Sequence, residues 1–153
     1  MKLTDFAEAK NLVGIFLDRA AALGDKPFLW AKRDNSWQSL SWNDVAAQAC
    51  LLAGHLRALG LSDGDRVVLV SENRPEWCIA DLAIMAAGCV TVPAYITNTE
   101  RDHLHILEDS GARAVIVSTE KLAKPLLPAI MRSGHVEHVV AMESLKRHQA
   151  GPF

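Results

Sequence analysis

Arg66-Val67-Val68-Leu69-Val70 is a short apolar run in which polar and apolar side chains do not alternate. A run of this kind is typical of a β-strand that is covered on both faces. Asn73-Arg74-Pro75-Glu76 follows closely and predicts the start of a helix, with Asn73 as its N-cap and Pro75 in its first turn. This helix is expected to run to about Ala87. A strand followed by a helix is the repeating unit of a parallel sheet.

The same unit recurs along the chain at a spacing of about 24 residues, with strands expected to begin near residues 67, 90, 114 and 138. Pro93 is expected to end the second strand, because proline removes a donor from a strand's hydrogen-bond ladder. We therefore predict an α/β fold, a parallel sheet with helices on both faces. The further expected strands are 89–92, 114–117 and 138–141, and the further expected helices are 99–110 and 121–131.

A helix and a short hairpin are expected before the sheet. The helix spans residues 11–23, and two strands, 27–31 and 36–40, are joined by the polar turn 32–35. A second helix should start at Ser41, where Ser41-Trp42-Asn43-Asp44 forms a capping-box pattern, and stop at Gly60. The predicted organisation is an initial helix and hairpin over about residues 1–42, βα units over about 43–141, and a truncated tail over 142–153.

Composition and charge exclude several classes of protein. The chain has 153 residues, a formal net charge of −2 and no cluster of basic residues, so we expect no nucleic-acid partner. No apolar stretch is long enough for a transmembrane segment, and no secretory leader is recognisable, so a cytoplasmic location is expected. No two of the three cysteines, Cys50, Cys78 and Cys89, are close enough in the sequence to form a CxxC pair. We expect them to be buried free thiols.

The familiar short motifs of catalysis are missing. The sequence contains neither the phosphate-binding loop of NTPases nor the glycine-rich dinucleotide fingerprint, and neither a nucleophile elbow nor a zinc-protease motif. His103 and His105 lie two residues apart on a predicted helix and are not expected to share a metal ion. Glu72 and Glu76 receive structural roles, Glu72 in a turn and Glu76 reaching back to the helix cap. Trp77 is expected to anchor that helix in the core.

An ordered series of short stretches resembles the N-terminal region of the adenylate-forming superfamily. The resemblance runs from about Leu12 to Val140. Within that superfamily, the sequence looks most like the long-chain fatty acyl-CoA synthetase branch. Each stretch is short, but their order and spacing together are specific. The stretches are Gly64-Asp65-Arg66-Val67, Glu72-Asn73-Arg74-Pro75-Glu76-Trp77, Ala80-Asp81-Leu82-Ala83, Val92-Pro93-Ala94-Tyr95-Ile96-Thr97 and Asp109-Ser110-Gly111-Ala112.

The resemblance implies an incomplete N-terminal subdomain of the adenylate-forming fold. In that family a fatty or other carboxylic acid attacks ATP in the presence of Mg²⁺, giving an acyl-adenylate, and CoA then displaces AMP. The family's ATP-handling motifs come after the matched region. The resemblance therefore implies no catalytic, cofactor-binding or metal-binding residues in this chain, which we expect to be inactive alone. The alternative is a non-catalytic α/β binding or regulatory module.

Two residues are candidates for substrate contacts. In related synthetases the loop after the second strand lies toward the CoA-binding side, which implies substrate-side roles for Tyr95 and Thr97. The alternative is structural, with Tyr95 packed in the core and Thr97 helping to cap the helix that starts at Thr99. We also expect the chain to self-associate, because removing the rest of such a fold leaves an open sheet edge and an apolar face.

Overall fold

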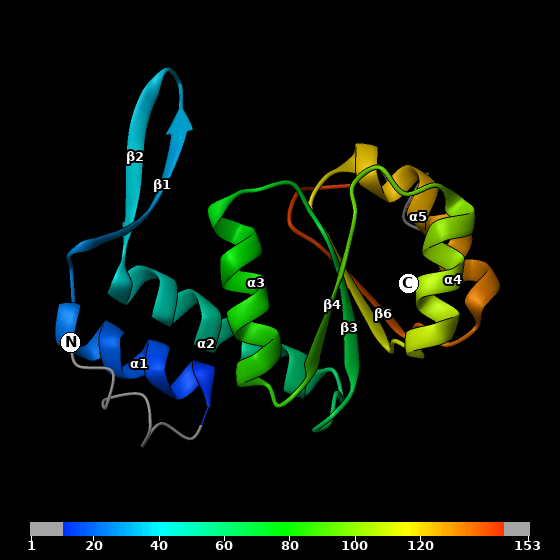
Figure 1. Cartoon of the computed structure of the whole chain (residues 1–153), viewed down its shortest axis with the longest axis horizontal. Coiled ribbons are helices and arrows are strands. Elements are labelled where there is room, and N and C mark those ends of the chain that lie inside the picture. Colours follow the sequence, from blue (N-terminus) through cyan, green and yellow to red (C-terminus); the bar gives the residue numbers. More distant parts are fainter. Residues whose placement is uncertain (1–10, 146–153) are drawn as a thin grey trace.

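The structure, a computed structural model, describes residues 11–145. The described part opens with helix α1 and an antiparallel hairpin and then alternates helices with the strands of a second sheet (Figure 1). The elements are α1 (Leu12–Leu23), β1 (Pro27–Arg33), β2 (Ser36–Ser41), α2 (Trp42–Ala58), β3 (Arg66–Val70), α3 (Pro75–Ala86), β4 (Val90–Ala94), α4 (Glu100–Ser110), β5 (Ala114–Val117), α5 (Glu120–Ser133) and β6 (His138–Ala141).

The main sheet has four strands in the order β4-β3-β5-β6, and every neighbouring pair is parallel. Its centre is β3, where Val68 lies opposite Val92 of β4 and Val115 of β5. The predicted α/β class and parallel sheet are therefore confirmed. The last four residues of β3 and all of β5 are buried, whereas the edge strands β4 and β6 are partly exposed.

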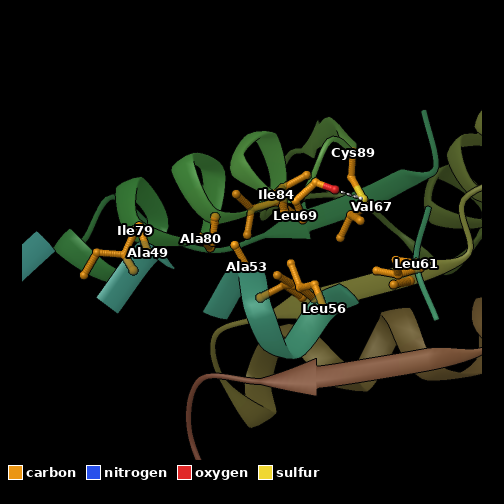
Figure 2. Close-up of a cluster of buried hydrophobic side chains, with 14 of the residues drawn as sticks. Ala49, Ala53, Leu56, Leu61, Val67, Leu69, Ile79, Ala80, Ile84 and Cys89 are labelled. Atoms are coloured by element: carbon orange, nitrogen blue, oxygen red, sulfur yellow. Dashed lines mark hydrogen bonds between the residues drawn. The ribbon is translucent and has the colours of Figure 1, made fainter. Parts of the chain in front are cut away.

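Helices cover both faces of this sheet, as predicted. Alternate residues of β3 point to opposite faces, so Val67 and Leu69 belong to one core and Val68 and Val70 to the other. Figure 2 shows the first core, in which Leu69 lies among residues of α2 and α3. Its buried members are Phe16, Val45, Ala49, Ala53, Leu56, Leu61, Val67, Leu69, Ile79, Ala80, Ala83, Ile84, Ala87, Cys89, Ala114 and Ile116.

The second core lies on the opposite face, where α4 and α5 cover the sheet. Its strand residues come from β3 and β5, and α5 contributes a buried apolar stripe. The buried members are Val68, Val70, Leu107, Ala112, Val115, Val117, Leu122, Ala123, Leu126, Ala129, Ile130 and Val136.

Local capping signals place the helix ends. Ser41 and Thr99 each form a complete capping box, with Asp44 and Asp102 respectively, although the preferred acid is glutamate. At the end of α2, the amide N–H of Leu61 donates to the carbonyl of Leu56 while Gly60 has φ +92°. This is the Schellman arrangement that the glycine predicts.

Strand β4 is longer than predicted. It continues through Pro93 to Ala94, whereas proline was expected to end it at residue 92. The reason is position in the sheet, since β4 is an edge strand and the missing N–H of Pro93 removes no bond to a neighbour. Helix α5 likewise contains both Pro125 and Pro128 and extends beyond the predicted 121–131.

The hairpin also has a tighter turn than predicted. Only Asp34 and Asn35 lie outside the strands, and their φ values of 50° and 61° are typical of a type I′ turn. The hairpin's root packs on the first core, where Phe28 and Trp42 stack with ring centroids 3.8 Å apart. Its tip projects away from the helices (Figure 1).

The cysteines differ from the expectation of buried thiols. Cys50 is exposed, Cys78 is half-buried and Cys89 is buried, and all three are free. Residue Cys50 lies on the outer side of an amphipathic helix, so a helical position alone did not ensure burial. Among residues 11–145, no helix is long and apolar enough to cross a membrane.

Candidate functional site

Polar side chains cluster where the parallel strands of the main sheet end. We call this line of strand ends the carboxyl edge of the sheet. Ser71 and Glu72 follow β3, Ser118 and Thr119 follow β5, and Glu143 lies shortly after β6. Ligands of open α/β sheets usually bind outside this edge. The carboxyl edge is therefore the candidate site.

Glu72 joins the ends of the two central strands. The hydroxyl of Ser118 donates to Glu72 Oε2 over 2.5 Å, and the hydroxyl of Thr119 donates to Oε1 over 3.4 Å. Ser118 is fully buried. Its hydrogen bond, opposed by burial, keeps the pKa of Glu72 below its usual value. Glu72 is thus an ionised acceptor at neutral pH. The sequence predicted only a place in the turn before α3, whereas the structure shows that Glu72 binds residues at the end of β5.

Arg74 forms the centre of a second polar group at the same edge. Its Nε donates to Glu76 Oε2 over 2.9 Å, and its Nη1 donates to Glu143 Oε1 over 2.7 Å. These hydrogen bonds, first that to Glu76 and then that to Glu143, raise the pKa of Arg74. Arg33 of β1 donates to the other oxygen of Glu76 over 2.6 Å. The ion pairs therefore connect the hairpin, α3 and the segment after β6.

The start of α3 differs from the prediction at two residues. Its N-cap is Arg74, without a side-chain capping bond, and not Asn73. Pro75 forces the preceding residue into extended geometry, which makes Arg74 the last residue outside the helix, with φ −153° and ψ 157°. The carboxylate of Glu76 accepts from the side chain of Arg33 and from the side chain of Arg74, the N-cap residue itself.

Tyr95 lines a cavity of about 450 Å³ at this edge, and the residue is 81% exposed. The structural alternative for this residue, packing in the core, is therefore wrong. Thr97 is exposed and is not among the lining residues, and Thr99 itself caps α4. The lining residues are Ser71, Glu72, Asn73, Trp77, Pro93, Ala94, Tyr95 and Ile96. Roles for Tyr95 and Thr97 in substrate binding remain predictions.

Trp77 links the core to the candidate site. It is half-buried and packs against the first core, while its outer side lines the cavity beside Tyr95. It is therefore only partly the core anchor that the sequence predicted. An aromatic surface beside Glu72 gives the cavity both an apolar wall and a fixed negative charge.

Metal-binding geometry is not found between residues 11 and 145, where no group of three potential ligand side chains comes together. His103 is 1% exposed and burial lowers its pKa, so it is a neutral core residue. At the amino-terminal end of β3, on the side of the sheet away from the candidate site, Arg66 donates to the carbonyls of Ser110 and Gly111 at the end of α4.

Comparison with known families matches residues 16–152 to the model of the AMP-binding enzymes. Over 90 residues the chain is 39% identical to the long-chain-fatty-acid–CoA ligase FadD15 of Mycobacterium tuberculosis, covering 59% of this chain and 15% of that protein. Over 130 residues it is 30% identical to the human mitochondrial acyl-coenzyme A synthetase ACSM3, covering 82% of this chain and 22% of that protein.

Solved structures show the same fold. An anthranilate CoA ligase, AuaEII, in complex with anthranoyl-AMP superposes with a TM-score of 0.76 at 25% identity, covering 92% of this chain and 26% of that one. A fatty acyl CoA synthetase of Mycobacterium tuberculosis gives 0.70 at 26% identity, with coverage of 86% and 26%. The chain therefore spans only about a quarter or less of the length of these relatives.

Proposed function

Because the chain belongs to the family of AMP-binding enzymes, we propose that it forms the N-terminal part of an acyl-CoA synthetase. The proposed reaction joins a fatty or other carboxylic acid to CoA at the expense of ATP, with Mg²⁺, releasing AMP and pyrophosphate. The match of residues 16–152 to the family carries this proposal, and relatives that are acid–CoA ligases support it. A cytoplasmic location is part of the proposal and is supported by three free thiols.

Within that enzyme, the proposed role of this chain is to supply one wall of the substrate site. Tyr95 offers an exposed aromatic ring and hydroxyl at the carboxyl edge, and Thr97 lies two residues further along the same loop. The hydrogen bond from Ser118 to Glu72 joins the ends of β3 and β5, and Glu72 lines the same cavity as Tyr95. None of these residues is proposed to take part in bond making.

A chimera tests the proposal. Replacing the matching segment of the FadD15 ligase with residues 16–141 of this chain is expected to preserve acyl-CoA formation. In that chimera, Tyr95→Ala should raise the KM for CoA roughly tenfold or less with little change in kcat, since a substrate-positioning contact contributes uniform binding. A folded chimera without activity would favour the alternative, a non-catalytic binding or regulatory module.

The 153-residue chain alone is expected to form no acyl-adenylate, because the sequence contains no phosphate-binding loop. The measurement is pyrophosphate release with ATP, Mg²⁺ and fatty acids of increasing chain length. Release above background that persists through repurification would show that the chain is itself catalytic.

Self-association of this chain is a further part of the proposal. Of the two edge strands, β4 carries Pro93, whereas β6 (His138–Ala141) contains no proline. Two β6 edges are therefore expected to pair, and a formal net charge of −2 provides little repulsion. Sedimentation velocity should show a rising average mass with concentration. A single monomer boundary at every concentration would contradict this expectation.

A further inference from the structure

The cavity at the carboxyl edge contains one charged side chain, that of Glu72. Of the described residues that line this space of about 450 Å³, none is a lysine, an arginine or a histidine. The hydrogen bond from Ser118 keeps the pKa of Glu72 below its usual value, so the carboxylate is ionised at neutral pH. A phosphate or carboxylate group placed in the cavity would therefore meet a like charge without a compensating cation.

The charge of Glu72 is not neutralised by an ion pair. Its side-chain hydrogen bonds come from the uncharged hydroxyls of Ser118 and Thr119. Arg74 also lowers the pKa of Glu72 through its charge, but the ion pairs of Arg74 are made with two other glutamates. An ionised carboxylate offers about four acceptor positions, so Glu72 retains capacity for a ligand.

The surroundings of the cavity do not supply a surplus cation. Arg33 and Arg74 are joined to Glu76 and Glu143 by hydrogen bonds, so these four charges balance one another. The carboxylate of Glu72 is the charge that remains at this part of the carboxyl edge. The local electrostatics therefore favour a cationic ligand.

Aromatic side chains form the other distinctive part of the lining. Trp77 is half-buried and held by its packing against the first core, whereas Tyr95 is 81% exposed. Pro93 and Ile96 complete the apolar surface. The face of an aromatic ring attracts an organic cation, and tryptophan does so most strongly. Aromatic rings beside an unpaired carboxylate are thus suited to a cation that carries apolar groups.

We propose that this cavity binds a small organic cation with an alkylammonium group. The positive charge lies beside Glu72, and the methyl or methylene groups around it contact Trp77 and Tyr95. A metal ion is a poorer occupant, because no group of three potential ligand side chains comes together within residues 11–145. The proposal rests on the side chains of the cavity and not on the ligase function.

Choline and neohexyl alcohol test the proposal, because they have the same shape and differ in the charged nitrogen that carbon replaces. NMR titrations of the 153-residue chain follow the indole N–H of Trp77, which Trp77→Phe assigns. Choline should shift this resonance saturably. Neohexyl alcohol should bind at least about tenfold more weakly, since it lacks the attraction to the rings and to Glu72. Inorganic phosphate should cause no saturable shift.

Variants separate the carboxylate from the rings. Glu72→Gln keeps an oxygen acceptor for Ser118 and removes the charge, so choline should bind roughly tenfold more weakly while neohexyl alcohol binds as before. Tyr95→Leu keeps an apolar wall without a ring face and should also weaken choline binding. Glu108→Gln is the matched control, because Glu108 is exposed on α4 and is not among the lining residues. Circular dichroism checks that each variant is folded.

Two kinds of ligand carry an alkylammonium group, namely free organic cations and acids with the ammonium at their far end. γ-Trimethylammoniobutyrate distinguishes them in the same titration. Weaker binding than that of choline assigns the cavity to a free cation, because Glu72 repels the second charge. Equal or tighter binding assigns it to an ammonium-bearing acid.

The contrary results are equally definite. Equal binding of choline and neohexyl alcohol would show an apolar cavity without selection for charge and would overturn the proposal. Unchanged choline affinity in Glu72→Gln would overturn it too, as would saturable binding of phosphate or the absence of any saturable shift with choline. An inactive chimera would count against the ligase function alone, because these titrations use the chain by itself.

Discussion

Leu69→Ala should lower the free energy of unfolding by about 2–5 kcal/mol, the range for deleting a fully buried leucine side chain. Leu69 has no exposed surface and lies on the central strand β3, flanked by β4 and β5 (Figure 2). Strands on both sides restrict the collapse of the cavity, so the loss belongs in the upper part of this range. Urea unfolding followed by circular dichroism measures the change.

Leu51→Ala is the matched control for that experiment, because it deletes the same atoms from the exposed side of α2. The side chain of Leu51 is 64% exposed, and the expected change is within about 0.5 kcal/mol. Similar losses in the two variants would contradict the assignment of Leu69 to the core. An altered urea dependence in Leu69→Ala would instead indicate either a change in the compactness of the denatured state or a departure from two-state unfolding.

Most of the fold was predictable because its signals are local. The unbroken apolar runs that became β3 and β5 identified strands buried on both faces, and the capping pairs Ser41–Asp44 and Thr99–Asp102 placed two helix starts. Strand order is not local. It is the sheet position of β4 that allows Pro93 inside a strand, and no pattern within residues 90–94 distinguishes an edge strand from a central one.

The candidate site was less predictable because its contacts join distant residues. Ser118 is 46 residues from Glu72 and Glu143 is 69 residues from Arg74, so helix-capping rules alone assigned Glu72 and Glu76 to local roles. One available signal was overlooked. Glu72 and Ser118 both follow buried strands by one or two residues, and the ends of neighbouring parallel strands meet at one edge.

The family resemblance, and no local sequence pattern, made Tyr95 a candidate for substrate contact. Its place after β4 and its exposure agree with a substrate-side loop, but exposure alone would suit any surface tyrosine. The geometry that favours the carboxyl edge is instead the convergence there of Glu72, Ser118 and the Arg74 ion pairs. Because each of these contacts depends on one charged side chain, a single substitution is expected to remove it.

Glu72→Ala should destabilise the chain by roughly 1–3 kcal/mol at pH 7, because the buried hydroxyl of Ser118 loses its acceptor. The destabilisation should depend on pH in a defined direction. The hydrogen bond from Ser118 lowers the folded-state pKa of Glu72 below the ordinary 4.5, so its contribution is complete above about pH 4.5 and is lost as the pH falls through the folded-state pKa. Urea unfolding of both proteins from pH 7 to pH 3 measures the difference.

Comparing wild type with variant at each pH is essential, since Asp44, Asp65 and Asp102 also have lowered pKa values and titrate in the same acid range. Their effects cancel in the difference, which should shrink toward acid pH. Glu72→Gln keeps an oxygen acceptor for Ser118 and removes the charge, so it should cost less than Glu72→Ala at pH 7 and show no such decline of its own. A difference between wild type and Glu72→Ala that stays constant from pH 7 to pH 3 would mean that the ionised carboxylate contributes nothing to holding the ends of β3 and β5 together.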